Sequence, residues 1–143
     1  MNTNLGFCLA LHRAHASLQL KLDDELGIYH GISFNDFALL NLLAQADGGR
    51  VSIPARVRPL GQPPSAVQRQ LILLEKIGLV VREGANGDRQ AVLRPAGRAL
   101  VHAARETAES ICTEAVVSIA PAAVDMVSAA LVTLARTPNL AIS

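Results

Sequence analysis

Aromatic residues are scarce in this sequence, which has no tryptophan, one tyrosine and three phenylalanines, although half of its 143 residues are hydrophobic. A core built from it must be aliphatic and rich in alanine, which favours packed helices. No unbroken apolar stretch reaches the roughly 18 residues that a membrane span needs, and no basic segment precedes the first apolar residues. We therefore expect one helical, cytoplasmic domain with no membrane partner.

The sequence also lacks the motifs of the common enzyme classes. It has no phosphate-binding loop, no Gly-x-Ser-x-Gly elbow, and no set of Cys and His residues at metal-site spacing. We therefore predict a protein that is not an enzyme and that uses no cofactor or metal.

The most informative stretch spans residues 65–97. It begins with apolar residues at helical spacing, which predict a helix with one buried stripe. Gly78 suits a left-handed cap at the end of that helix. A short β-branched run at 79–81 and a second short apolar run at 91–93 flank a polar turn at 84–88 and predict two strands. A helix followed by such a ribbon is the layout of a winged helix. The residues of the buried stripe are Val67, Leu71 and Leu74.

The preceding residues predict a helix-turn-helix. A short helix is expected from Ile53 to about Leu60, with Ser52 as its N-cap. Residues 61–64 then form the turn, and Pro64 takes the first position of the second helix. Two helices joined by a tight turn are the arrangement in which the second helix enters a DNA groove.

The face of the second helix opposite its buried stripe is polar and basic. Side chains of these types can contact base edges or phosphates in a major groove. An exposed polar face is also an ordinary protein surface, so the helix alone does not decide its role. Arg58, on the short helix expected at 53–60, is placed to contact phosphates. The polar face carries Ser65, Arg69 and Lys76, with Gln68 at its edge.

Charge is unevenly distributed, although the net charge is only +1. Residues 50–98 hold nine basic and three acidic residues, an excess of six positive charges, whereas the rest holds four basic and nine acidic residues. A basic lobe between acidic ends is the electrostatic pattern of a nucleic-acid-binding protein. The alternative is an ordinary solvated surface.

Four further helices are expected. The first spans 5–27 and ends at Gly27, and the second, capped by Ser33, runs from 34 to about 46. After the ribbon, helices are expected at 98–120 and 122–136. The apolar faces of the first helix and the last two exceed what the small lobe must cover, so we expect them to pack against a second copy of the chain. Packing within one chain is the alternative.

The first helix carries a small cluster of titratable residues, His12, Arg13 and His15. The spacing of the two histidines places both rings on one side, where they could bind a carboxylate ligand or a metal. Because no Cys or acidic ligands lie nearby, an ordinary surface feature is the alternative to a metal site.

From residue 33 to residue 97 the chain resembles the MarR family of bacterial winged-helix regulators. SFNDFALLNLLA is similar to the second helix of the family, and SIPARVRPLGQPPSAVQRQLILLEKIGLVVRE is similar to its helix-turn-helix. Asp88 and Arg89 match the Asp-Arg pair at the tip of the family's wing. The chain departs from the family at Gln90, which replaces a second wing arginine, and at Ile72 and Leu73, which are apolar where the family is usually polar.

The resemblance implies a mainly α fold with a small β-wing: a winged helix-turn-helix at 33–97 and a helical dimerisation region at 5–30 and 98–138. It implies a homodimer that binds a pseudo-palindromic operator in double-stranded DNA. The family's regulators commonly respond to a small ligand, often an aromatic carboxylate. We therefore expect a repressor with a small-molecule effector.

Residue roles follow from the same resemblance. The helix that begins at Pro64 contacts DNA in the major groove. Arg89 reaches the minor groove or its phosphates, and Asp88 orients the Arg89 guanidinium. The cluster on the first helix is the candidate effector site. The expected DNA-binding residues are Ser65, Gln68, Arg69, Asp88, Arg89 and Arg58, and the expected effector-binding residues are His12, Arg13 and His15.

Two alternatives remain open. The winged helix could serve as a protein-interaction module, with Ile72 and Leu73 in the partner surface and with weak or no DNA binding. A redox-sensing regulator is the other, because some relatives sense peroxides through a cysteine near the start of the first helix, where Cys8 lies. Neither Cys8 nor Cys112 has a basic neighbour in sequence that would favour the reactive thiolate.

Overall fold

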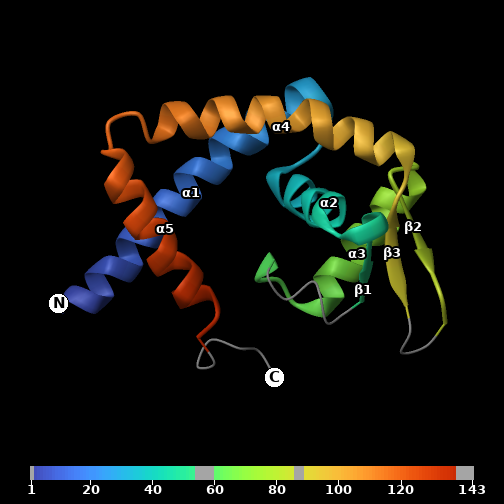
Figure 1. Cartoon of the computed structure of the whole chain (residues 1–143), viewed down its shortest axis with the longest axis horizontal. Coiled ribbons are helices and arrows are strands. Elements are labelled where there is room, and N and C mark those ends of the chain that lie inside the picture. Colours follow the sequence, from blue (N-terminus) through green and yellow to red (C-terminus); the bar gives the residue numbers. More distant parts are fainter. Residues whose placement is uncertain (1, 54–59, 86–88, 138–143) are drawn as a thin grey trace.

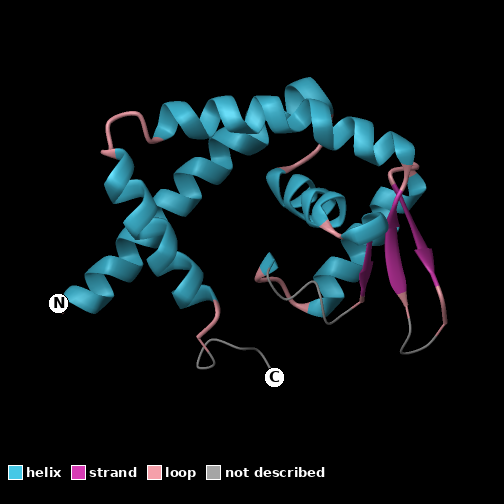
Figure 2. Ribbon diagram, in the orientation of Figure 1, coloured by secondary structure: helices cyan, strands magenta, loops and turns pink. Residues whose placement is uncertain are grey.

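A computed structural model describes residues 2–53, 60–85 and 89–137. Helices dominate, and a small sheet lies at one end of the molecule (Figures 1 and 2). The elements in chain order are α1 (Thr3–His30), α2 (Phe34–Gln45), the 3₁₀ helix η1 (Asp47–Gly49), β1 (Arg50–Ser52), α3 (Pro64–Lys76), β2 (Val80–Glu83), β3 (Gln90–Leu93), α4 (Pro95–Ala115) and α5 (Pro121–Ala135). This arrangement confirms the predicted fold class, mainly α with a β-wing. None of the described helices combines the length and the apolarity needed to cross a membrane.

The first helix, α1, is longer than the sequence predicted. Asn2 caps its start by accepting a hydrogen bond from the backbone N–H of Leu5 at 2.7 Å. The helix continues through Gly27 and ends at His30. The next residue, Gly31, caps it with a left-handed backbone (φ 71°), and its N–H donates to the carbonyl of Gly27. The prediction was wrong because a helix tolerates an interior glycine at modest cost, and Gly31, a few residues later, takes the left-handed cap.

The start of α2 was predicted correctly. The Ser33 hydroxyl accepts a hydrogen bond from the backbone N–H of Asp36 at 3.0 Å, and the Asp36 carboxylate accepts one from the backbone N–H of Ser33 at 3.1 Å. This reciprocal pair is a capping box, which satisfies two otherwise unpaired donors. The next backbone N–H, that of Phe34, donates to the Asp23 carboxylate of α1 at 2.7 Å, so the two helices are joined at this end.

The sheet is antiparallel with strand order β1-β3-β2. The pairing of β2 with β3 confirms the predicted ribbon, which runs from Val80 opposite Leu93 to Glu83 opposite Gln90. The strand β1 was not predicted, and Ser52, expected to cap a helix, instead pairs with Gln90. A three-residue strand has almost no periodicity of its own, and its partner is distant in sequence. Most of the helix expected at 53–60 falls at 54–59, outside the described residues.

The long helix α4 differs from the prediction at both ends. It begins at Pro95, so Gly97 lies within its first turn, and it ends at Ala115 rather than near residue 120. The helix must end before Pro121, because a proline disfavours helical backbone at the residue before it. Pro121 then opens α5, which was predicted to within about one residue. In Figure 1, α4 runs along the molecule from the sheet to α5.

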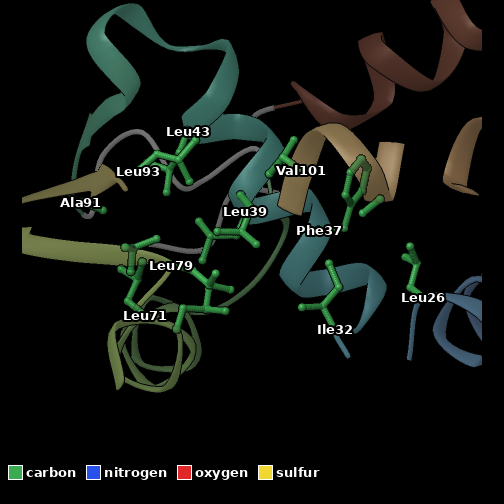
Figure 3. Close-up of a cluster of buried hydrophobic side chains, with 14 of the residues drawn as sticks. Leu26, Ile32, Phe37, Leu39, Leu43, Leu71, Leu79, Ala91, Leu93 and Val101 are labelled. Atoms are coloured by element: carbon green, nitrogen blue, oxygen red, sulfur yellow. The ribbon is translucent and has the colours of Figure 1, made fainter. Parts of the chain in front are cut away.

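The hydrophobic core lies where α2 packs against the sheet and the inward faces of α1, α3 and α4. Figure 3 shows Leu39 and Leu43 of α2 among Leu79, Leu93 and Val101. Only the C-terminal part of α1 joins this core. Leu22 and Leu26 are buried, whereas Leu18, predicted to belong to the same stripe, is 37% exposed. The N-terminal half of α1 therefore extends away from the core of its own chain.

Candidate nucleic-acid interface

Helix α3 is positioned by its buried stripe. Val67, Leu71 and Leu74 are fully or almost fully buried, as predicted, and they turn the opposite side of the helix outward. The helix starts with Pro64 in its first turn and ends before Gly78, whose φ of 82° is the left-handed conformation expected for a cap. The direction of the outward face is thus fixed by core packing rather than by the polar residues on it.

The outward face of α3 carries the residues predicted to contact DNA. Ser65 and Arg69 are exposed, and Gln68 is partly buried at the edge of the face. Lys76 in the last turn is also exposed. In the described part of the chain no ion pair involves Arg69 or Lys76. Both cations are therefore open to an anionic partner such as a phosphate.

An ion pair joins α3 to the wing. The Arg82 guanidinium of β2 donates to the Glu75 carboxylate at 3.0 Å through Nε and lies 2.9 Å from the same oxygen through Nη2. The backbone N–H of Arg82 donates to the second carboxylate oxygen at 3.0 Å. These hydrogen bonds, the backbone one foremost, lower the pKa of Glu75. The only acid of α3 is thus neutralised locally, and no pattern in the sequence indicated this pairing across a turn.

A second polar contact joins α3 to α2. The side-chain amide of Gln70 donates to the Asp36 carboxylate at 3.0 Å. Because Asp36 also caps α2, one carboxylate holds the start of α2 and the middle of α3 together. The helix that carries the cationic face is therefore braced on one side by α2 and on the other by the wing.

The wing carries Arg89 immediately before β3. Its side chain is exposed, and its backbone carbonyl accepts a hydrogen bond from the N–H of Ile53 at 2.9 Å. The backbone of Arg89 is therefore attached to the chain that leaves β1. Asp88, predicted to orient the guanidinium of Arg89, and Arg58, predicted to contact phosphates, both lie outside the described residues.

Arg50 is a basic residue of the wing for which no motif in the sequence indicated a role. Its Nη1 donates to Gln90 Oε1 at 2.8 Å and to Glu83 Oε2 at 3.4 Å, so the contact crosses all three strands. Gln90, which replaces the family's second wing arginine, thus holds a cation from β1 in place. Since β1 was not predicted, the sequence could not place Arg50 beside Gln90.

The candidate effector residues lie together on α1. The side chains of His12, Arg13 and His15 are all exposed, and no hydrogen bond or ion pair joins them to another described residue. They lie on the part of α1 that extends away from the core. Within the described ranges no group of three or more His, Cys, Asp and Glu side chains is placed to hold a metal ion.

Two pockets lie in the groove between α1 and α4. One, of about 400 Å³, is mostly apolar and includes Leu18, Lys21 and Ile111. The other, of about 380 Å³, includes Tyr29, Thr107 and also Ile111. Beside it, Thr107 Oγ1 lies 2.7 Å from His30 Nε2, which links α4 to the end of α1. Sequence reasoning missed this groove because it forms only when two distant helices pack.

The two cysteines lie on different helices. Both are unpaired, with Cys8 near the start of α1 and Cys112 in α4. Partial burial raises the pKa of the Cys112 thiol. Because the thiolate is the reactive form, this environment does not activate Cys112.

Solved structures with the same architecture are numerous. A MarR family transcriptional regulator from Streptomyces coelicolor, solved in complex with DNA, has a TM-score of 0.84 at 18% sequence identity, and the match covers 97% of this chain and 92% of that one. CouR from Rhodococcus jostii, solved with p-coumaroyl-CoA bound, has a TM-score of 0.82 at 20% identity, covering 94% and 93%. BldR from Sulfolobus solfataricus has a TM-score of 0.81 at 19% identity, covering 96% and 100%.

Sequence comparison gives no further match: no family model matches the chain, and no curated protein is significantly similar to it. The structural matches extend over nearly the whole chain and include both the winged helix and the flanking helices. The resemblance inferred from residues 33–97 is therefore confirmed at the level of structure, and the chain has the fold of the MarR family of transcriptional regulators.

Proposed function

We propose that the protein is a sequence-specific DNA-binding transcriptional regulator. The observation that carries this proposal is the cationic outward face of α3. Arg69 and Lys76 lie on it free of ion pairs with other described residues, Arg89 is exposed at the adjacent wing, and the only acid of the helix is bound by Arg82. A helix that presents cations without neighbouring acids suits the phosphate-lined major groove.

The structural neighbours support the same role. The Streptomyces coelicolor regulator of similar fold was solved with DNA, and its match covers 97% of this chain. On this proposal Ser65, Gln68 and Arg69 face the bases and phosphates of the major groove, and Arg89 binds along the adjacent minor groove. The predicted roles of Asp88 and Arg58 remain part of the proposal.

Binding to duplex DNA, measured by fluorescence anisotropy at several salt concentrations, tests the proposal. The wild-type chain should show a steep loss of affinity with salt. Arg69→Ala and Arg89→Ala should each weaken binding and reduce the salt slope by about one ion where the side chain contacts a phosphate. Arg136→Ala removes a cation after the end of α5, outside the proposed DNA-binding face, and is the matched control. It should leave the slope unchanged, provided that light scattering shows the same oligomeric state as wild type. Equal effects of all three variants, or no affinity at any salt, would refute the proposal.

We infer that the protein acts as a homodimer through residues 5–30 and 98–138. Helix α5 buries none of its residues within the single chain, and Met126 is 72% exposed. The N-terminal half of α1 and the turn after α4 are also apolar and exposed, for example at Phe7 and Val117. Apolar surfaces of this extent in a water-exposed chain are typical of an interface between copies. A dimer also fits a pseudo-palindromic operator, because each copy reads one half-site.

We further propose that the regulator is a repressor controlled by a small ligand. One neighbour of the same fold was solved with a bound ligand, p-coumaroyl-CoA. The exposed cluster of His12, Arg13 and His15 remains the candidate carboxylate site on α1. A ligand that prefers one dimer conformation would shift the DNA affinity by its differential affinity for the two states. A thermal-shift screen of aromatic acids against wild type and Arg13→Ala tests this assignment, since loss of a hit in the variant would support the cluster.

One observation favours a second candidate, a protein-interaction module. Leu73 on α3 and Ile77 just after its end are 62% and 63% exposed. They are four residues apart, so they lie on one side of the helix and could form part of an apolar surface for a protein partner. The salt titration separates the two functions, because an interaction module should show little affinity for DNA at any salt.

For the redox alternative, mass spectrometry after mild peroxide treatment should find Cys8 oxidised before Cys112, whose environment suppresses the thiolate.

A further inference from the structure

Helix α3 carries an apolar side chain within its polar outward face. Ile72 is 37% exposed, and it lies four residues after Gln68 and three after Arg69. At 100° per residue Ile72 points to within about 20° of Ser65, between Gln68 and Arg69. It therefore belongs to the face proposed to enter the DNA groove and not to the core side of the helix.

The neighbours of Ile72 select the kind of partner. Arg69 and Lys76 lie three residues before and four residues after it, on the same side of the helix, so both are within about one turn. Glu75, the nearby acid, is held by Arg82 and adds no free negative charge to the face. A single apolar group between two free cations is poorly suited to an apolar protein surface, but it suits an anionic duplex that presents apolar groups in its groove.

The major groove has one such group, the C5 methyl of thymine. Leu73, which is more exposed than Ile72, points about 80° away from Ser65, beyond Arg69, and so leaves the centre of the face. Ile72 is thus the apolar residue that shares the direction of the predicted base-reading side chains. A short, β-branched side chain at this position can contact a methyl group but can donate no hydrogen bond to a base edge.

We propose that Ile72 is a specificity-determining residue that contacts a thymine methyl in each half-site, so that the preferred operator has an A·T pair at that position. This inference rests on the proposed function. Burial of one methyl group corresponds to a change in affinity of roughly fourfold per contacted thymine. Because the copies of a dimer read two half-sites, replacing both thymines should have an effect of more than tenfold if the two contacts act independently.

The test uses the full chain and a duplex selected by it from a random pool. Each thymine is replaced in turn by deoxyuridine, which removes the C5 methyl and keeps the base pair. Wild type should bind more weakly when one particular thymine of each half-site is replaced. Ile72→Ala should bind the original duplex and the duplex with deoxyuridine at that position equally. Leu73→Ala, the matched control, should retain the wild-type preference for thymine.

The outcomes separate this inference from the proposed function. Salt-dependent binding of the selected duplex with no effect of deoxyuridine at any position would overturn the role of Ile72 and leave the regulator intact. The same conclusion follows if Ile72→Ala keeps the preference for thymine, or if Leu73→Ala loses it. Failure of the chain to select or bind any duplex would overturn both proposals and would favour a protein partner for this face.

Discussion

Gly97 lies in the first turn of α4, where the helix passes over the backbone between α3 and β2. A Cβ atom added there would collide with the carbonyl oxygen of Leu79 and would lie 2.6 Å from Leu93 Cδ1 and 3.1 Å from the Leu79 carbonyl carbon. The side chain of Leu93 could rotate, but the Leu79 backbone is fixed: its N–H donates to Leu74, and its carbonyl accepts from Arg94, both at 3.0 Å. The substitution Gly97→Ala must therefore displace α4.

The expected size of the effect comes from two destabilising contributions and one stabilising contribution. Overpacking a well-packed site costs about 1–3 kcal/mol, and weakening the hydrogen bond from Arg94 to Leu79 adds about 1 kcal/mol. Alanine is the better helix former by about 0.8–1 kcal/mol, which offsets part of this loss. We therefore expect Gly97→Ala to lower the free energy of unfolding by about 2 kcal/mol.

Gly27 provides a matched control, because it is also inside a helix but a Cβ atom added to it would have no neighbouring atom within 4 Å. Only the helix propensity then changes, so Gly27→Ala should raise the free energy of unfolding by about 0.5–1 kcal/mol. Denaturant unfolding followed by circular dichroism measures both values. One fixed protein concentration is used, since the stability of the proposed dimer would depend on concentration. If the two variants shift stability in the same direction, the close approach of α4 to Leu79 does not decide stability and the reasoning fails.

Three further predictions concern the ion pair, the cap and the proposed interface. Glu75→Gln should destabilise the fold most near pH 7, and the loss of stability should shrink as the pH falls below 4.5, the ordinary pKa of the carboxyl. The reason is that a lowered folded-state pKa gives stability that is present above the unfolded pKa and is lost on protonation of the folded state. A pH-independent difference would argue against the pairing with Arg82. Ser33→Ala should lower the free energy of unfolding by about 1 kcal/mol through loss of the cap of α2, and unchanged denaturation midpoints would show that the cap contributes little. Met126→Glu should convert a dimer to a monomer in light-scattering measurements, whereas Ile77→Glu, a charge at a similarly exposed apolar site, should not; dimers in both variants would exclude α5 from the interface.

The elements that the sequence predicted well are those with local signals. The start of α2 follows from Ser33 and Asp36, which satisfy each other within one turn. The limits of α3 follow from Pro64 at its start and from Gly78 just after its end. The outward position of Arg69 follows in turn from the spacing of the buried stripe. Local chemistry was sufficient because each of these features is decided within a few residues.

The features that the sequence did not predict depend on contacts between distant segments. The strand β1 exists because Val51 and its neighbours pair with β3, and three residues alone give no strand signal. The ion pair of Glu75 with Arg82 requires the angle at which β2 leaves α3. The contact of Arg50 with Gln90 requires β1 to be in place first. For the same reason, spacing placed Leu18 in the core, but the path of α1 leaves it partly exposed.

Helix α4 is a single unbroken helix of 21 residues, so it is roughly 30 Å long. Near its start Gly97 lies against the Leu79 backbone beside α3, and its far end leads into α5. Because the helix is this long, a tilt of about 10° about one end moves the other end by roughly 5 Å. In a symmetric dimer, the way in which α5 packs against the second copy would thus set the distance between the two wings.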